Sequence, residues 1–272
     1  EMFARSNVVL NSGVLTFAVT AENNREIPAW SQGVFFKWGS LVALAPAGNP
    51  YDPEVQAVYY PSHLNPSDWK GGLAGWDKIP YAHSNFNFSI PSATGEGVDA
   101  FEEYSGNTGF NESAGVGDIC RYISSGPGGK GWVEGKWRLP TNAELELLYE
   151  ETGIKTVSMG GFVNLTAELN RDAGNYLHGN FDPESGWFLG ANVAGTTATS
   201  DHRAVPPSGT VFLPASGQRY PDGNGDVVHV GAYGYYWAST PYPVNGGYIT
   251  DYLFIYKSGV DFNAADRSYA FP

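Results

Sequence analysis

The sequence predicts an α+β protein in which antiparallel strands dominate and long ordered loops connect them. Aromatic residues make up 15% of the chain, alongside 35 Gly and 18 Pro. This mixture is typical of short strands separated by tight turns. Strand-like runs gather at both ends of the sequence, and one clearly delimited helix lies between them. We therefore expect a single domain over residues 1–272, since β-rich domains often reach this length.

Five segments follow one another within that domain. They are N-terminal strands in 1–45, a loop-rich tract in 46–135, a helix with its approach in 136–153, a second loop-rich tract in 154–209, and C-terminal strands in 210–272. The long tracts are rich in Pro, Gly, Asn and aromatic residues, so we expect them to run over the surface.

The first segment carries two short β-type runs and one longer apolar run. Residues 7–10 and 14–19 read as strands, and Gly13 between them indicates a hairpin. The apolar run at 33–44 adds further strand signal. In the tract that follows, Ser67 is the predicted N-cap of a short helix through Trp69. Residues 99–104 are also predicted to form a turn of helix.

The clearest helix of the chain begins after Pro140. Thr141 is a good N-cap and Glu144 stands three residues later, which is the pattern of a reciprocal capping box. Gly153 is the expected stop at the other end. One face of the helix is predicted to pack against the rest of the domain through Leu145, Leu148 and Tyr149.

The C-terminal segment is predicted to contain only strands and turns. Residues 211–220 and 227–239 read as two strands joined by the Gly-rich turn at 221–226. Residues 248–256 and 260–262 read as a further hairpin.

Charge and cysteine content exclude several classes of function. The net charge of −13 repels phosphate backbones and anionic lipid, so we expect no nucleic-acid partner. Cys120 is the only cysteine, which excludes an internal disulfide or a cysteine-based metal cluster within this chain. No apolar run is long enough for a bilayer span, and we expect no membrane insertion of this domain. We also expect that a signal or anchor sequence is not included before Glu1.

Two residue patterns raise the question of ligands. Asp222, Asn224 and Asp226 alternate with glycine, a spacing that can place oxygen atoms around Ca²⁺. The alternative is a Gly-rich hairpin turn, where these residue types are favoured anyway. No Glu follows at the distance of an EF-hand loop, so the sequence predicts no cofactor and keeps Ca²⁺ only as an alternative.

Aromatic side chains are the other candidates for ligand binding. Exposed rings could stack on sugars, whereas buried rings would pack beneath the long loops, and packing is the favoured interpretation for any one residue. The candidates for stacking are Trp69, Trp76, Trp187, Tyr233 and Tyr242. The histidines, among them His229, are widely separated, and we predict no catalytic role for them.

The segment RLPTNAELELLY at 138–149 closely resembles the Arg-Leu-Pro-Thr-x-Ala-Glu signature of the formylglycine-generating-enzyme superfamily. The GQRY and GAYGYYWASTP segments at 217–220 and 231–241 resemble the Fibrobacter succinogenes major paralogous domain more specifically. Residues 4–7 and 32–40 are similar to the first strands of such domains in Bacteroidales surface lipoproteins, some of them fimbrillin-like.

The resemblance implies a C-type-lectin-like fold of twisted antiparallel sheets with one or two helices. It also implies that Arg138 holds backbone carbonyls or a carboxylate near the start of the helix. The residues implied to form the structural motif are Arg138, Pro140, Thr141, Glu144, Tyr236 and Trp237.

One departure from the superfamily bears on activity. The enzymes bind copper through paired cysteines near the carboxyl end, and this chain has only Cys120. We therefore predict that the protein is not such an enzyme. Related domains continue beyond the strand that resembles 267–271 into a Cys-containing segment, so a disulfide partner of Cys120 would lie outside the given sequence.

The expected function is a non-catalytic, extracellular recognition or adhesion module, as in the C-terminal domain of a fimbrillin-like lipoprotein at the cell surface. Its partner would be a surface glycan or protein, or other pilus subunits. The alternatives are a structural pilus subunit and a diverged enzyme of the superfamily. Calcium motifs of the lectin type are absent, so calcium-dependent sugar binding is not predicted.

Overall fold

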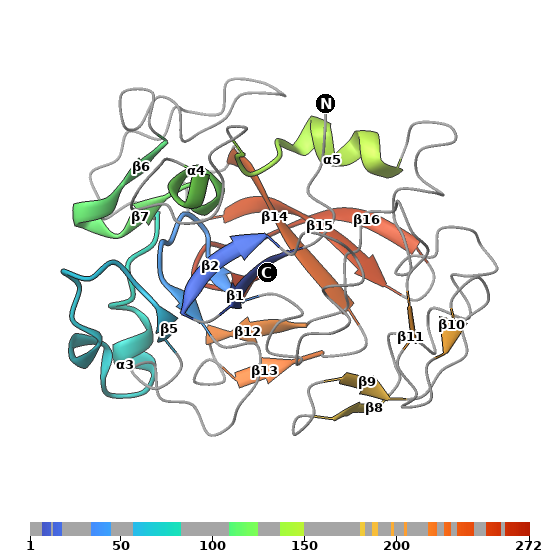
Figure 1. Cartoon of the computed structure of the whole chain (residues 1–272). Coiled ribbons are helices and arrows are strands. Elements are labelled where there is room, and N and C mark those ends of the chain that lie inside the picture. The colour runs from blue at the N-terminus through green and yellow to red at the C-terminus, as the bar shows by residue number, and fades with distance from the viewer. Residues whose placement is uncertain are drawn as a thin grey trace.

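The computed structural model describes part of the chain. The described residues are 7–11, 13–17, 34–44, 57–82, 109–124, 137–149, 180–182, 187–189, 197–198, 204–205, 217–221, 226–229, 233–241, 249–256 and 259–272. These residues form a mixed α/β structure of small, mostly antiparallel sheets with few helices (Figure 1). The predicted α+β class is confirmed at this level.

The N-terminal hairpin forms as the sequence predicts. Strand β1 (Val8–Asn11) pairs antiparallel with β2 (Val14–Phe17). Gly13 lies in the turn with φ of 78°, a left-handed conformation that favours glycine over residues with a Cβ atom.

The apolar run predicted at 33–44 is buried at every residue from 34 to 44, but it does not form one strand. It contains β3 (Phe36–Lys37) and β4 (Ala43–Leu44), separated by a turn in which Gly39 has φ of 66°. The turn lets this run contribute side chains to three separate parts of the core.

The sheet with the longest strands in the described part has the order β14–β15–β16. Strand β14 (Tyr233–Pro241) pairs with β15 (Ile249–Tyr256), which pairs with β16 (Gly259–Asp266). The predicted last hairpin is therefore confirmed, with a longer second strand than expected. Helix α5 (Asn142–Tyr149) lies across this sheet and contacts β14 and β15 (Figure 1).

A second sheet has the order β13–β12–β17–β3 and joins both ends of the sequence. Strands β12 (Gln218–Tyr220) and β13 (Asp226–Val228) form the predicted hairpin, and β17 (Ala270–Phe271) pairs with both β12 and β3.

The predicted returning strand at 227–239 requires a correction. It is divided between β13 and β14, which belong to different sheets. The break falls at His229, whose φ of 63° is incompatible with an extended strand. The backbone N–H of Tyr233 donates to the carbonyl of His229 (3.1 Å), which links the residue after β13 to the first residue of β14.

Short elements occupy the described parts of the two loop-rich tracts. They are β5 (Ala57–Tyr59), η2 (Pro66–Trp69), α3 (Leu73–Trp76), β6 (Phe110–Asn111), η4 (Glu112–Ala114), β7 (Val116–Gly117), α4 (Ile119–Ser124), β8 (Asn180–Asp182), β9 (Trp187–Leu189), β10 (Thr197–Ala198) and β11 (Ala204–Val205). The short helix at Trp69 is confirmed, but Asn65 caps it rather than Ser67. The Asn65 side chain accepts from the N–H of Ser67 (3.1 Å). Residues 99–104 and Gly153 lie outside the described residues.

An aromatic core ties the two larger sheets together. The indole of Trp237 stacks on Phe271 with ring centroids 3.9 Å apart, and its N–H donates to the carbonyl of Phe36 (2.9 Å). The N–H of Trp38 donates to the carbonyl of Ala238 (2.8 Å). Tyr236 and Trp237 are both buried, so this part of the expected structural motif contributes to the core.

Candidate functional site

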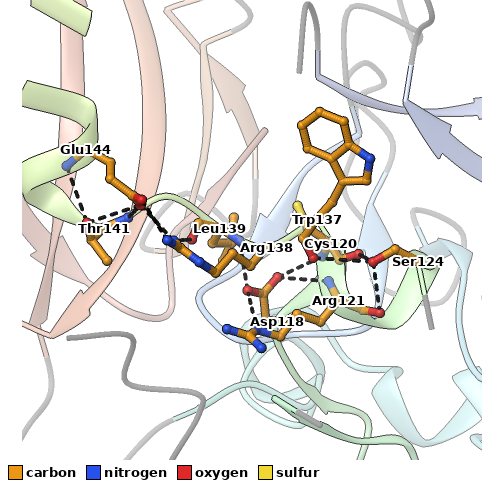
Figure 2. Close-up of polar contacts among 9 residues, drawn as sticks. All are labelled: Asp118, Cys120, Arg121, Ser124, Trp137, Arg138, Leu139, Thr141 and Glu144. Atoms are coloured by element: carbon orange, nitrogen blue, oxygen red, sulfur yellow. Dashed lines mark hydrogen bonds and ion pairs between the residues drawn. The ribbon is translucent and has the colours of Figure 1, made fainter. Parts of the chain in front are cut away.

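The capping box at the start of α5 forms as predicted. The backbone N–H of Thr141 donates to the Glu144 carboxylate (2.9 Å), and the N–H of Glu144 donates to the Thr141 hydroxyl (3.3 Å) (Figure 2). Two amides that the helix itself cannot satisfy are therefore engaged at this end. Leu145 is buried on the packing face, as predicted. The side chains of Leu148 and Tyr149 lie outside the described part.

Arg138 binds a carboxylate, as the resemblance implies. Its two terminal nitrogens each lie 2.6 Å from a different oxygen of Glu144, and one of them also donates to the carbonyl of Leu139 (3.1 Å). Partial burial alone would raise the pKa of Glu144. The hydrogen bonds from Arg138 and Thr141 and the charge of Arg138 outweigh it and hold that pKa below its ordinary value.

Asp118 adds a second carboxylate that the sequence analysis did not single out. It is fully buried, and one oxygen accepts from the backbone N–H groups of Cys120 (2.8 Å) and Arg121 (3.2 Å) at the start of α4. The other oxygen accepts from the N–H of Leu139 (2.7 Å), next to Arg138 (Figure 2). An Asp directly before a short apolar helical run is a readable N-cap signal, and it would have identified this residue.

Asp118, Arg138, Thr141 and Glu144 therefore form one polar network, which we call the signature clamp. It joins the starts of α4 and α5. The same segment is held to β14, since the N–H of Ser239 donates to the carbonyl of Pro140 (2.8 Å) and the N–H of Asn142 donates to the Thr240 hydroxyl (3.0 Å). The clamp's carboxylates are engaged with backbone amides, hydroxyl groups and guanidinium groups, which makes this a structural arrangement.

The aromatic stacking candidates lie in different environments. Trp69 is 3% exposed and Trp76 is 0% exposed, and the indole N–H of Trp76 donates to the carbonyl of Ser268 (3.0 Å). These two rings pack in the interior, so they offer no open surface for stacking. Tyr233 is half-buried at the start of β14. The side chain of Trp187 and all of Tyr242 lie outside the described residues.

Lys37 is a second buried polar group that the sequence analysis missed. Its ammonium donates to the carbonyl of Trp76 (2.6 Å) and lies 4.6 Å and 4.2 Å from the ring centres of Trp76 and Tyr81. Burial lowers the pKa of Lys37 to about 7, against the opposing charges of Asp77 and Asp266. A lysine within an apolar run gives no sequence signal of this kind, because its cage comes from distant segments.

A half-exposed polar and aromatic group surrounds the strained turn between β13 and β14. The Nδ1 atom of His229 lies 2.9 Å from the Tyr235 hydroxyl and 3.4 Å from the Gln218 side-chain nitrogen. The imidazole contacts Tyr233 edge to face at 5.0 Å and lies roughly parallel to Tyr235 at 6.2 Å. We call Gln218, His229, Tyr233 and Tyr235 the His229 cluster.

Only part of the candidate calcium site lies within the described residues. Asp222 and Asn224 lie outside the described residues, and Asp226 is described only as the backbone of β13, paired with Tyr220. Within the described part, no group of three or more His, Cys, Asp or Glu side chains is arranged to hold a metal ion. The antiparallel pairing of β12 with β13 shows that these two strands form a hairpin, and the calcium alternative stays a prediction.

Comparisons of the chain with protein-family models, with curated proteins and with solved structures find no match. Within the residues that the structure describes, none of the helices has the length and apolar character needed to cross a membrane. The features of the described residues that bear on function are therefore the signature clamp and the His229 cluster.

Proposed function

We propose that this chain is a non-catalytic recognition or adhesion module with a C-type-lectin-like fold, displayed at a cell surface. The observation that carries the proposal is the use of charge in the signature clamp. Arg138 and Glu144 bind each other in two-point geometry, and Asp118 accepts three backbone N–H groups. Charged groups engaged in this way hold the chain in place, and catalysis needs groups that can reach a substrate.

The alternative of a structural pilus subunit has weaker support, because the outer strand of the β14–β15–β16 sheet is poorly suited to pairing with a strand of another subunit. In the described part, β16 is an outer strand. The side chains of Asp261 and Asn263 accept from the backbone N–H groups of Phe262 and Ala264, each at 2.8 Å. An added strand would have to displace these contacts, and polar side chains on edge strands oppose such pairing.

The proposal is tested by a glycan array and a panel of matrix proteins, each probed with and without Ca²⁺. We expect binding to at least one glycan or protein, with the same strength in both conditions. Absence of binding to every glycan and every matrix protein would contradict a recognition function. Formation of filaments by the purified chain would favour the pilus subunit instead.

The enzyme alternative has a separate test. A Cu(I) titration of the chain and of its Cys120→Ser variant should give the same weak binding, since a single thiolate is a poor site for this ion. Tight binding that disappears in the variant would overturn the non-catalytic proposal.

A further inference from the structure

His229 has an unusual backbone conformation. Among the described residues, His229 is the only one other than glycine with a positive φ, at 63°. Holding such a conformation costs roughly 1–3 kcal/mol, and residues of this kind concentrate at ligand sites where the surrounding structure fixes them. Two backbone hydrogen bonds hold His229 and Tyr233 in place. Tyr233 donates to the carbonyl of His229 (3.1 Å), and the carbonyl of Tyr233 accepts from the N–H of Gly217 (2.9 Å).

The contacts of the imidazole engage one of its two ring nitrogens, Nδ1. The amide nitrogen of Gln218 can only donate, and it approaches Nδ1 together with the Tyr235 hydroxyl. With Nδ1 as the acceptor of both contacts, the proton of the neutral ring is on Nε2. His229 is exposed, whereas Tyr235 and Gln218, which approach Nδ1, are buried, so Nε2 is the ring nitrogen that is not directed at these two residues.

An aromatic ring stands beside this donor. Tyr233 is half-buried, and its ring is held by an edge contact with His229 and by Phe254 at 5.2 Å. Both residues sit on backbone that is hydrogen-bonded into the sheets, so neither needs to be ordered when a ligand arrives. A preorganised ring next to a preorganised donor is the combination that binds a sugar, through its apolar face and one of its oxygen atoms.

Charge selects the kind of sugar. Among the described residues, the partners of His229 and Tyr233 are aromatic rings, an amide and backbone groups, and none of them is charged. Partial burial lowers the pKa of His229, so the ring stays neutral at physiological pH. The chain as a whole carries a net charge of −13, which disfavours anionic ligands.

From this geometry we infer that His229 and Tyr233 form a shallow binding site for neutral oligosaccharides, with the Nε2–H of His229 as donor and the ring of Tyr233 as stacking surface. The inference rests on the proposed recognition function and names its ligand class. It requires neither calcium nor any other metal.

Isothermal calorimetry with defined oligosaccharides tests the site. The neutral probes are maltopentaose, cellopentaose, xylopentaose, laminaripentaose and lactose, and the anionic probes are sialyllactose and a heparin oligosaccharide. We expect at least one neutral probe to bind, unchanged by EDTA. Tyr233→Ala should weaken it by about tenfold or more, whereas Tyr233→Phe should stay within about threefold, because the ring is kept.

His229→Asn is the sharpest variant. Asn tolerates a positive φ, and its side-chain oxygen can accept from Tyr235 as Nδ1 does, but its amide NH2 group is too short to reach the position of Nε2. We expect a loss of affinity of about tenfold, the value of one hydrogen bond left unmade. His63→Asn is the matched control, since His63 is also exposed but lies elsewhere, with its ring nitrogen 3.2 Å from the carbonyl of Ser113. It should bind as the unchanged protein does.

The outcomes separate the site from the proposed function. Binding of glycans that His229→Asn and Tyr233→Ala leave unchanged would overturn this site and leave the recognition function standing. Binding of only the anionic probes would overturn the ligand class. No binding to any glycan or matrix protein would overturn both. Nitrogen NMR of the His229 ring provides a test that needs no variant. A proton on Nδ1 in the free protein would contradict the assignment. Ring nitrogen shifts that do not change on titration with a probe that binds would contradict it as well.

Discussion

The signature clamp and the His229 cluster are built from different side chains and use them in opposite ways: the clamp consists mainly of charged groups that bind within the fold, and the cluster of neutral polar and aromatic groups. In the clamp, Asp118 and Glu144 accept from backbone amides, and Arg138 binds the Glu144 carboxylate. The His229 cluster keeps one ring edge exposed on a residue with a positive φ. The difference teaches that a conspicuous sequence motif can engage its charged groups within the fold, while a candidate ligand site combines a predicted stacking residue, Tyr233, with His229, for which the sequence predicted no role.

The largest expected effect comes from removing the centre of the clamp. Asp118→Ala should lower the free energy of unfolding by about 3–4 kcal/mol, because three backbone N–H groups and the Arg121 side chain lose a buried, charged acceptor. Urea unfolding followed by circular dichroism measures this. Asp68→Ala, at an exposed position on η2, is the control and should change stability by less than about 0.5 kcal/mol. Equal effects of the two variants would show that the clamp does not stabilise the fold.

The next largest expected effect is the pH dependence of the free energy of unfolding that Lys37 causes. Its folded pKa of about 7 lies below the ordinary 10.5, so between these values the unfolded state binds the proton more readily than the folded state. Stability should therefore rise with pH in this window, by about 1.4 kcal/mol per unit and about 3 kcal/mol from pH 7 to 9.5.

Urea unfolding of Lys37→Met over the same pH range checks this. The rise should disappear, whereas the exposed-site variant Lys78→Met should keep it. Measurements should stop near pH 9.5, since burial raises the pKa of Tyr81 to about 12 and tyrosine ionisation in the unfolded state then lowers stability. A flat profile for the unchanged protein would mean that Lys37 titrates normally.

A smaller effect is expected from the outer part of the clamp. Arg138→Lys keeps the charge but loses the two-point contact with Glu144, and we expect a loss of about 1 kcal/mol because the pair is partly exposed. The folded pKa of Glu144 is depressed, so its contribution is present above the unfolded pKa near 4.5 and is lost as pH falls through the folded value. The difference between Arg138→Lys and the unchanged protein should shrink at acid pH. A pH-independent difference would indicate lost packing instead.

The smallest effect on stability should come from the His229 cluster. His229→Gly removes the imidazole contacts but also relieves roughly 1 kcal/mol of backbone strain. We expect the free energy of unfolding to stay within about 1 kcal/mol of the unchanged protein. A thermal melt compared with that of Asp118→Ala makes the contrast between the two regions direct. A loss as large as that of Asp118→Ala would place His229 with the structural residues.

Local sequence was enough to predict the features whose partners lie nearby. The hairpin around Gly13 and the last hairpin of the chain formed as expected. So did the capping box of Thr141 and Glu144, because a cap depends on residues three positions apart. The prediction of one strand over 227–239 was wrong, because β13 and β14 belong to different sheets. The alternating sequence pattern gave no sign that the extended backbone would break at His229.

Burial and long-range partners were the features that local pattern could not supply. Trp69 and Trp76 carried the same sequence signal as Tyr233, yet the first two lie in the interior and the third is half-exposed. An aromatic residue favours both a core and a binding surface, so only its neighbours in space decide between them.

The sequence by itself determined the α+β class, the local turns and caps, the acidic charge and the presence of a single cysteine, because these depend on composition or on residues close along the chain. The tertiary structure decided that Asp118 reaches Leu139, that Lys37 lies between Trp76 and Tyr81, and that Gln218 and Tyr235 orient His229. Each of these contacts joins segments whose approach is set by the packing of whole sheets, and that packing has no local signature.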